Sequence, residues 1–539
     1  MSDFDSAAEA LRPGRGAKHP RLREAARLFA DGKPGAALKP LKEFLGKQPD
    51  DPVALHLMGE IALAQGRDDA ALGLMTRALQ AAPGLAGARY SRASILLRRG
   101  EAEAALADAT LLLADDASNP RFRVLKAMAL EAVEDYAASA ELWLALAQDF
   151  PDAANCWTRA GNALRLLGRR EEAVAAYRRA IAADPSSGDP WWGLADLKTY
   201  RFDDAEVAAM EAQLQRPGLA PEDRVRLHFA LGKACADRGS YETAFGHYAK
   251  GNALHRLGIK HDPAVLSAYV ARAKQVFTPE FFARREGYGA ESDAPIFIVG
   301  MMRAGSTLVE QILASHSQVE ATRELSDLAA VSLTLQTGSY WDALQALDRD
   351  TATELGKRYL AATASHRKLG RAHFLDKMGA NFAQAGLIRL ILPQAKIVDV
   401  RRHPLACGFS IFSQLFPSGQ NDSYRLAEIG RLYRDYVELM AHFETVLPVH
   451  RVIYEELVTD PEREIRRLLD HLGLPFEAAC LDFHKSGRVV TTVSSEQVRR
   501  PIYKSALEQW RHFEPWLGPL AESLGPVLAA YPSVPEEWR

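Results

Sequence analysis

The chain has 539 residues, of which 47% are hydrophobic and 25% are charged, so it is long and apolar enough to form more than one domain. Its formal net charge of −3 excludes an electrostatic case for binding nucleic acid or a membrane surface. The four cysteines lie far apart without a CxxC spacing, at positions 156, 235, 407 and 480. This spacing argues against a zinc site and a disulfide framework, and it indicates thiols in a reducing compartment.

The N-terminal stretch MSDFDSAAEALRPGRGAKHPRLREAARL has no apolar core of the kind that a signal peptide carries. No later run approaches the length of a transmembrane helix. We therefore expect a soluble, cytoplasmic protein without a membrane partner.

Small residues recur at a constant step through the first half of the chain. Gly32, Gly66, Gly100 and Gly168 fall on one 34-residue period, and Glu134 fills the missing place. This is the tetratricopeptide period, in which each repeat is a pair of antiparallel helices with a small residue at the tight turn. The segment GNALRLLGRREEAVAAYRRAIAADP is similar to that family's pattern. The sequence therefore predicts an α-solenoid.

The period fades after Pro185, although residues 228–256 predict one further helical pair. We expect the α-solenoid to span residues 1–258 and a helical linker to span residues 259–293. Trp191 and Trp192 are expected to pack at the end of the stack. Such an array has a concave groove that fits a protein or peptide partner, but a rigid arm or a dimer surface would look the same in sequence.

The stretch PIFIVGMMRAGSTL, residues 295–308, carries the first chemical signal. Four β-branched or aromatic residues between Pro295 and Gly300 predict a buried parallel strand. A glycine loop follows, and then residues 308–316 have helical spacing. In a strand, loop and helix of this kind, main-chain N–H groups and a helix N-terminus converge on a phosphate.

The loop differs from the version that binds ATP or GTP. That version has a lysine after its second glycine and a Ser or Thr that holds Mg²⁺, whereas Ser306 takes the lysine position here. The cation of this loop is Arg303, whose planar fork suits a pair of phosphate or sulfate oxygens. The loop therefore favours a 5′-phosphosulfate group over a magnesium-bound triphosphate.

Further strands are expected at residues 373–377, 395–402 and 449–457, with helical stretches such as 381–393 between them. Strands that alternate with helices predict a parallel sheet covered on both faces. The expected fold is therefore an α-solenoid followed by an α/β, P-loop-type parallel sheet domain over residues 294–539.

Several blocks in the second half occur in an order that resembles the tyrosylprotein sulfotransferases. The whole chain resembles proteins that join tetratricopeptide repeats to such a domain. The blocks that carry the resemblance are GMMRAGSTLVEQILASHSQV, ATRELSDL, the pair Asp376 and Lys377, RRHPLACGFS, YEELV and SSEQVRRPIYKSALEQW. Met302, Ala304, Ser306 and His403 depart from the usual residues of that family.

The resemblance implies transfer of a sulfuryl group from 3′-phosphoadenosine 5′-phosphosulfate to a hydroxyl, with 3′-phosphoadenosine 5′-phosphate as the product and no metal. It implies that the segment from 494 to 503 closes over the nucleotide. The donor-binding residues that it implies are Arg303, Ala304, Gly305, Ser306 and Thr307 at the phosphosulfate, Arg402 and Ser410 at the 3′-phosphate, and Tyr454, Ser494 and Ser495 around the nucleotide.

The resemblance also implies catalytic roles. Glu324 falls where the family's general base stands, and Lys377 matches the lysine that steadies the transferring group together with Arg303. Ser494 or Ser495 matches a serine in the same role. A positioned carboxylate that removes the hydroxyl proton contributes about 10²–10⁴-fold to such reactions.

Each of these residues also has a simpler interpretation. Glu324 could precede a helix that begins at Leu325 and be favoured there by the helix dipole. Lys377 could be a solvated lysine at a strand end, and Arg401 and Arg402 could be a charged strand terminus. His403 is expected to be a surface residue, or a residue that supports the site from behind, rather than a base.

The function that we expect is that of a sulfotransferase whose acceptor is a protein tyrosine, a sugar or a small phenol or alcohol. A scaffold with a decayed nucleotide site, whose repeats do the work, is one alternative. A P-loop kinase is another, but the loop lacks its lysine, and Asp399 stands inside an expected strand rather than at its end, where a magnesium ligand would be.

Overall fold

The computed structural model describes residues 18–322, 324–335, 338–417, 419–486, 498–502, 504 and 507–538. By its internal contacts the chain forms two compact units, residues 1–193 and residues 194–539, and each is described by itself. The domain limits expected at residues 258 and 293 remain predictions.

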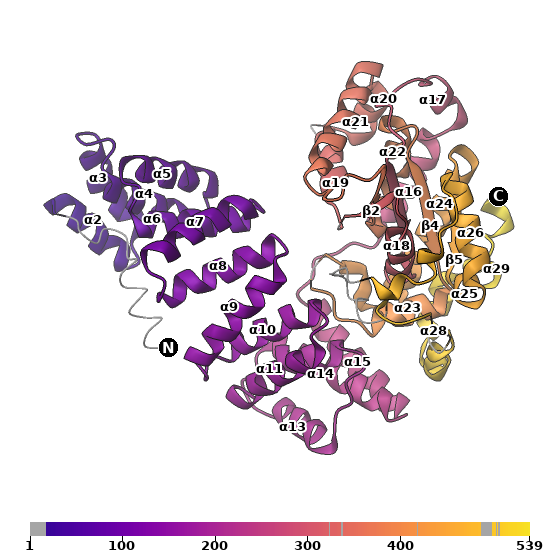
Figure 1. The fold of residues 1–539 in the computed structure, drawn as a ribbon, viewed down its shortest axis with the longest axis horizontal. Coiled ribbons are helices and arrows are strands. Elements are labelled where there is room, and N and C mark those ends of the chain that lie inside the picture. Colours follow the sequence, from indigo (N-terminus) through magenta and orange to yellow (C-terminus); the bar gives the residue numbers. More distant parts are fainter. Residues whose placement is uncertain are drawn as a thin grey trace. The chain divides into compact units, whose positions relative to one another are not determined.

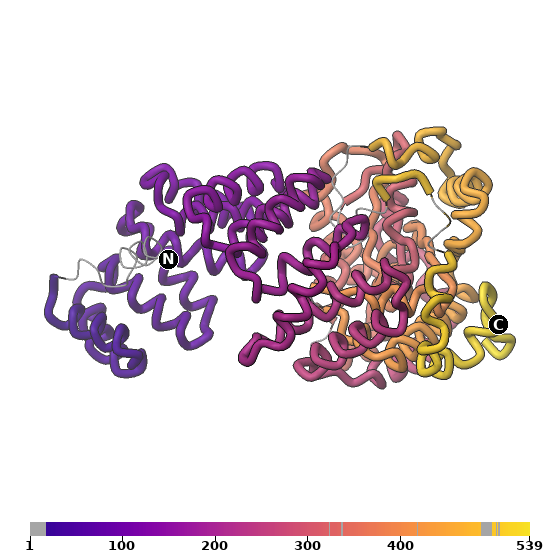
Figure 2. The backbone as a smooth tube through the Cα atoms, turned by 90° about the horizontal axis from the view of Figure 1, so that it is seen from below, coloured from indigo at the N-terminus to yellow at the C-terminus, as the bar shows by residue number. Residues whose placement is uncertain are grey.

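The first unit is built from antiparallel helical pairs, drawn in indigo to magenta in Figures 1 and 2. Its helices are α2 (Pro20–Ala30), α3 (Pro34–Leu45), α4 (Pro52–Ala64), α5 (Asp68–Ala81), α6 (Ala86–Arg98), α7 (Ala102–Asp115), α8 (Pro120–Ala132), α9 (Tyr136–Asp149), α10 (Ala154–Leu166), α11 (Arg170–Ala183) and α12 (Gly188–Asp196), whose last residues belong to the second unit.

The turn inside each helical pair needs a left-handed backbone, and this requirement explains the 34-residue glycine step. Gly32, Gly66, Gly100 and Gly168 have φ values of 72°, 71°, 78° and 74°. Glu134 adopts the same conformation, with φ of 64°, although a non-glycine residue is strained there. The turn geometry is therefore kept even where the glycine is missing.

The second unit holds the sheet and the helices around it. Its elements are α13 (Asp204–Leu214), α14 (Pro221–Asp237), α15 (Tyr241–Arg256), α16 (Ala264–Val276), α17 (Pro279–Ala283), β1 (Pro295–Gly300), α18 (Ser306–Ala314), β2 (Val319–Ala321), α19 (Asp327–Leu333), α20 (Tyr340–Ala346), α21 (Arg349–Ala364), β3 (His373–Asp376), η1 (Gly379–Gln384), α22 (Ala385–Ile391), β4 (Lys396–Arg401), α23 (Pro404–Phe412), η2 (Asn421–Tyr424), α24 (Leu426–Val446), β5 (Val449–Ile453), α25 (Tyr454–Thr459), α26 (Pro461–Leu472), η3 (Ala478–Cys480), η4 (Phe483–Lys485), η6 (Gln509–Trp516), α28 (Gly518–Leu524), α29 (Pro526–Ala530) and η7 (Glu536–Trp538).

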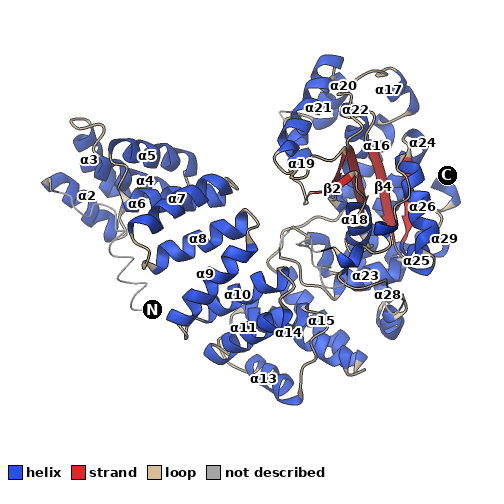
Figure 3. Ribbon diagram, viewed as in Figure 1, coloured by secondary structure: helices blue, strands red, loops and turns tan. Residues whose placement is uncertain are grey.

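The five strands form one parallel sheet in the order β2-β3-β1-β4-β5, shown in red in Figure 3. All six residues of the central strand β1 are buried, as expected for a strand that is covered on both faces. The predicted α/β parallel sheet is therefore confirmed. Register pairs Ile298 of β1 with Val398 of β4 and Phe297 of β1 with Asp376 of β3.

The strand expected at residues 449–457 was too long. Strand β5 ends at Ile453, and α25 begins at Tyr454. Glu455 and Glu456 stand in the first turn of this helix, where acidic side chains interact favourably with the helix dipole. Strand β2 has only three residues and was not predicted.

The helical pair expected at residues 228–256 is present as α14 and α15, and it belongs to the second unit. A Cβ atom on Gly232 would lie 2.6 Å from the Tyr248 ring, so glycine permits this close helix contact. The pair packs on α23. The Phe245 and Phe412 rings stack at 5.6 Å, and Nδ2 of Asn252 donates to the Phe412 carbonyl at 2.8 Å.

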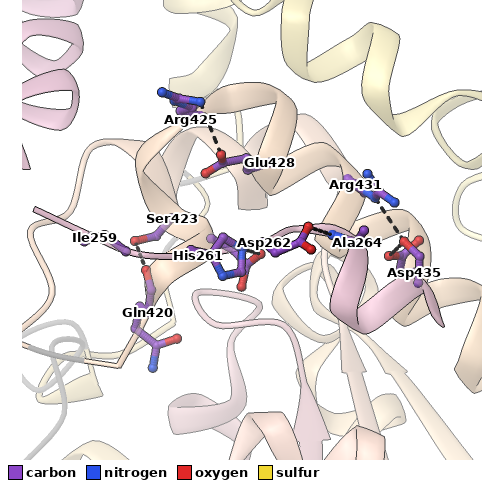
Figure 4. Close-up of polar contacts among 12 residues, drawn as sticks. Ile259, His261, Asp262, Ala264, Gln420, Ser423, Arg425, Glu428, Arg431 and Asp435 are labelled. Carbon is purple, nitrogen blue, oxygen red and sulfur yellow. Dashed lines mark hydrogen bonds and ion pairs between the residues drawn. The ribbon is translucent and has the colours of Figure 1, made fainter. Parts of the chain in front are cut away.

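The chain between α15 and α16 lies beside η2 and α24, as Figure 4 shows for Ile259, His261 and Asp262. Arg256 at the end of α15 makes a two-pronged ion pair with Glu428, at 3.0 and 3.1 Å. The His261 ring lies 2.5 Å from a carboxylate oxygen of Asp422. The end of α15 and His261 in the expected linker are thus fixed to α24 and η2 by partly buried polar contacts.

Across the described ranges, we find no helix with both the length and the apolar character needed to cross a bilayer. The four cysteines are buried and form no disulfide, in agreement with the sequence interpretation.

Candidate functional site

The sheet brings the predicted site residues to one edge. All five strands are parallel, so their carboxyl ends share that edge. The chain leads from β1 to β2 on one side of the sheet and from β4 to β5 on the other, and ligands of open α/β sheets bind at such a switch point. The predicted residues that follow the five strands in chain order are Arg303, Glu324, Lys377, Arg402 and Tyr454.

The loop after β1 is shaped by left-handed residues. Gly300 and Gly305 have φ of 137° and 108°, and Arg303 has φ of 63°. Helix α18 begins at Ser306, directly after Gly305. The Leu308 and Val309 N–H groups donate to the Gly305 carbonyl, and the positive end of the helix dipole at such an N-terminus favours an anion in front of it.

The main chain of this loop is packed too closely for side chains. A Cβ atom on Gly305 would lie 2.5 Å from the Tyr454 ring, and one on Gly300 would lie 2.4 Å from the Val400 carbonyl oxygen. A Cβ atom on Gly379, after β3, would lie 2.7 Å from the Gly300 carbonyl oxygen. Glycine at 300 and 305 thus lets the loop pack closely against its protein neighbours in front of α18. We call residues 300–306 the cradle, because the main-chain amides of such a loop can hold a phosphate group.

Two guanidinium groups stand beside the cradle. Nε of Arg303 donates to Oγ of Ser410 at 3.1 Å, and Nη1 of Arg402 donates to the Arg303 carbonyl at 3.2 Å. The Arg402 guanidinium lies over the Tyr454 ring, 4.9 Å from its centre. Burial and the charge of Arg402 lower the pKa of the Arg303 guanidinium. Like charges this close favour a bound anion.

Other loop residues are structural. Ala304 is fully buried, so it can offer a ligand only its main chain. The Cys407 thiol donates to the Met302 carbonyl at 3.2 Å. Burial raises the pKa of this thiol to about 12, which keeps it protonated and able to hold the loop.

Lys377 and Glu324 are in contact at the ends of β3 and β2. The Lys377 side chain is 4% exposed and forms an ion pair with the Glu324 carboxylate, which is 54% exposed. A second carboxylate, that of the buried Glu310, lies 3.9 Å from Nζ of Lys377. Sequence reasoning missed Glu310, although it stands four residues after Ser306 on the same face of α18.

Three of the simpler interpretations can be compared with the structure. The helix expected at Leu325 begins at Asp327 and has Ser326 as its N-cap, and the buried Lys377 is not a solvated lysine. Arg401 is the last residue of β4, as the interpretation as a charged strand terminus has it, but it is only 1% exposed and its Nη2 donates to the Asp399 carboxylate at 2.8 Å.

Two buried acids hold the strand ends. Asp399 lies inside β4, as predicted, and accepts a hydrogen bond from the Tyr436 hydroxyl. Asp376 at the end of β3 accepts from the Tyr359 hydroxyl at 2.7 Å. Burial raises the pKa of Asp376 to about 7. Both acids are engaged by protein donors and are turned away from the solvent.

His403 packs rather than reacts. Its ring stacks on Trp510 with the ring centres 4.9 Å apart, and burial lowers its pKa. Its main-chain N–H donates to Glu455 at 3.0 Å. It thereby fixes the start of α23, the helix that carries Ser410.

Two predicted residues, Ser494 and Ser495, lie outside the described residues, as do residues 496, 497 and 503 of the segment from 494 to 503. Among the residues that are described, no group of three or more histidine, cysteine, aspartate or glutamate side chains is arranged to hold a metal ion.

Models of two protein families match separate parts of the chain. Residues 295–478 match the model of the sulfotransferase family, and residues 28–95 and 154–197 match models of the tetratricopeptide repeat. The first half of the chain therefore carries tetratricopeptide repeats, and the second half carries a sulfotransferase-family domain.

Individual relatives are distant. An uncharacterized protein of Aquifex aeolicus (strain VF5) is 31% identical over 421 residues, which are 75% of this chain and 54% of that protein. Protein-tyrosine sulfotransferase 1 of Danio rerio is 28% identical over 280 residues, 48% of this chain and 75% of that protein. The chain thus spans about half the length of the Aquifex relative.

Among solved structures, the sulfotransferase domain from the Synechococcus PCC 7002 olefin synthase is similar, with a TM-score of 0.32 and 22% identity. The match covers 42% of this chain and 90% of that domain.

Proposed function

Because residues 295–478 form a sulfotransferase-family domain, we propose that this chain transfers a sulfuryl group from 3′-phosphoadenosine 5′-phosphosulfate to a hydroxyl group. The donor supplies the sulfuryl group, whose bond to the bridging phosphate oxygen breaks as the bond to the acceptor oxygen forms. The observation that carries the proposal is the contact between Lys377 and Glu324 beside the cradle of the first strand.

The cradle suits the phosphate end of the donor. The N–H groups at the start of α18 and the Arg303 guanidinium hold the 5′-phosphosulfate. Arg402 and Ser410, which both contact Arg303, hold the 3′-phosphate. Tyr454, which packs against Gly305, lies beside the nucleotide.

Lys377 and Glu324 have different roles in the proposed transfer step. Lys377 places a positive charge next to the leaving oxygen, where negative charge develops. Glu324 is more exposed and accepts the proton of the acceptor hydroxyl as general base. When Glu324 binds the acceptor hydroxyl, the Glu310 carboxylate, 3.9 Å from Nζ of Lys377, still balances the charge of the buried lysine.

A kinase is less compatible with these side chains. A magnesium-bound triphosphate needs the loop lysine that Ser306 replaces, and a carboxylate at a strand end. Asp399 lies inside β4 and is bound by Arg401. A pure scaffold would not need the ion pair of Lys377 with Glu324 beside the cradle.

The acceptor that we propose to test first is a protein. The first unit carries repeats of a kind that bind peptides in a concave groove, and a relative from Danio rerio is named a protein-tyrosine sulfotransferase. A sugar or a small phenol remains the alternative acceptor class.

The test is transfer of labelled sulfate from the donor to the components of a cell extract by the full chain. We expect the wild-type chain to label an acceptor and Glu324→Gln to lower that rate by about 10²-fold or more. Glu462→Gln is the matched control, because Glu462 is 55% exposed and is also paired with a cation, Arg466, but on α26.

Equal rates for wild type and Glu324→Gln would remove the general-base role. No labelling by the wild-type chain, in an extract that a known sulfotransferase labels, would contradict the proposed function.

A further inference from the structure

A buried polar cluster joins the end of α12 to the chain that follows α23, and no sequence motif indicates it. Nζ of Lys198 donates to Oε1 of Gln414 at 2.7 Å and lies 2.9 Å from Oδ1 of Asp196. Nε2 of Gln414 donates to the same Asp196 oxygen at 3.2 Å. Asp196 and Gln414 are 7% and 2% exposed. The Asp196 carboxylate is therefore fixed away from water, beside a lysine whose side chain is 25% exposed.

This cluster adjoins the donor cradle. Gln414 follows the end of α23, and Ser410 in the last turn of that helix accepts the hydrogen bond from Arg303. Burial and Arg402 lower the pKa of the Arg303 guanidinium, whereas the Asp196 carboxylate raises it. The charge of Asp196 therefore acts on the same guanidinium that faces the donor.

Lys198 is held in place by its surroundings. Its φ of 61° is a backbone conformation that residues other than glycine rarely adopt. This backbone conformation accompanies the contact of its ammonium group with both Asp196 and Gln414. The next lysine in this region, Lys233, is engaged by Asp237 on its own helix, so it does not replace Lys198 as the partner of Asp196.

A buried carboxylate without its cation is costly and recruits the nearest positive charge. Without Lys198, the Asp196 carboxylate would draw on the Arg303 guanidinium. The donor's phosphate groups need the same guanidinium. Competition between Asp196 and the donor for Arg303 would then weaken donor binding. Removing the charges of both Lys198 and Asp196 would end this competition.

We propose that Lys198 is a positioning residue of the donor site, which neutralises the buried Asp196 carboxylate and so leaves Arg303 to the donor. This inference rests on the proposed function, in which Arg303 binds the donor. It extends the donor site to residues that lie well before the sulfotransferase match, which begins at residue 295.

The test is a calorimetric titration of 3′-phosphoadenosine 5′-phosphate into the full chain. We expect Lys198→Met to weaken binding by about tenfold, whereas Asp196→Asn binds within about threefold of wild type because it removes the competitor. The double variant Asp196→Asn with Lys198→Met should return to within about threefold of wild type, and Lys198→Arg should bind like wild type.

A merely structural role would give a different pattern, in which the two single variants both weaken binding and the double variant is weaker still. That pattern, or wild-type affinity in Lys198→Met, would overturn the inference. If Lys198→Met does not fold, Lys198→Gln carries the same comparison. Failure of the wild-type chain to bind the nucleotide would instead refute the proposed function, and this inference with it.

Discussion

Replacing Gly305 by alanine should destroy the donor cradle while leaving most of the protein folded. Gly305 has φ of 108°, and forcing a non-glycine residue into such a region costs about 1–3 kcal/mol. The new Cβ atom would also lie 2.5 Å from the Tyr454 ring, and relieving an overlap of this kind costs about 1–3 kcal/mol more. Together the two terms come to about 2–6 kcal/mol.

A second glycine separates backbone strain from the effect on the cradle. Gly473, after α26, has φ of 74°, and a Cβ atom there would meet nothing within 4 Å. Gly473→Ala should therefore lose only the strain term of about 1–3 kcal/mol. Stability is measured by urea unfolding, and donor-site integrity is measured by binding of 3′-phosphoadenosine 5′-phosphate.

The two variants should differ in binding. We expect Gly305→Ala to lose nucleotide affinity by more than about tenfold, because Tyr454 and the loop amides must move, and Gly473→Ala to bind like wild type. Wild-type affinity in Gly305→Ala would refute the assignment of this loop as the cradle.

Two further predictions concern buried charge and backbone strain. Burial raises the pKa of Asp376 to about 7, above its value of about 3.9 in an unfolded chain, so the folded state binds the extra proton and stability falls as the pH rises from about 4 to about 7. The amide of Asp376→Asn can still accept the hydrogen bond from Tyr359 and does not titrate. The free energy of unfolding of this variant, measured in urea, should exceed that of wild type by little at pH 4 and by at most about 4 kcal/mol at pH 8. An equal difference at both pH values would contradict this prediction. Glu134→Gly should stabilise the first unit by about 1 kcal/mol, because the φ of 64° at that turn suits glycine, and an unchanged or lower melting temperature would argue against strain at this position.

The features that could be predicted from the sequence are those imposed by local geometry. Each helical pair needs a left-handed turn, which places a glycine at constant spacing, so the repeats could be predicted from the sequence. Glu134, which stands where that glycine is missing, also has a positive φ. The buried strand before Gly300 and the glycine loop after it were also readable, because both are continuous in sequence.

The features that sequence reasoning missed depend on tertiary structure. Strand β2 has three residues, too few to show a period, and it forms only because β3 is beside it. The contact of Glu310 with Lys377 requires α18 and β3 to be adjacent. The hydrogen bond between Lys198 and Gln414 joins residues more than 200 positions apart in the sequence, and no sequence motif links them.

In the proposed function, the turn after the first strand binds the phosphate end of a sulfated nucleotide through Arg303 and main-chain amides. A calorimetric titration that compares 3′-phosphoadenosine 5′-phosphate with ATP and magnesium tests it most directly. We expect the first nucleotide to bind with one-to-one stoichiometry, to lose its affinity in Arg303→Ala, and to be preferred over ATP with magnesium. Preference for ATP with magnesium, or binding that survives the loss of Arg303, would contradict the account.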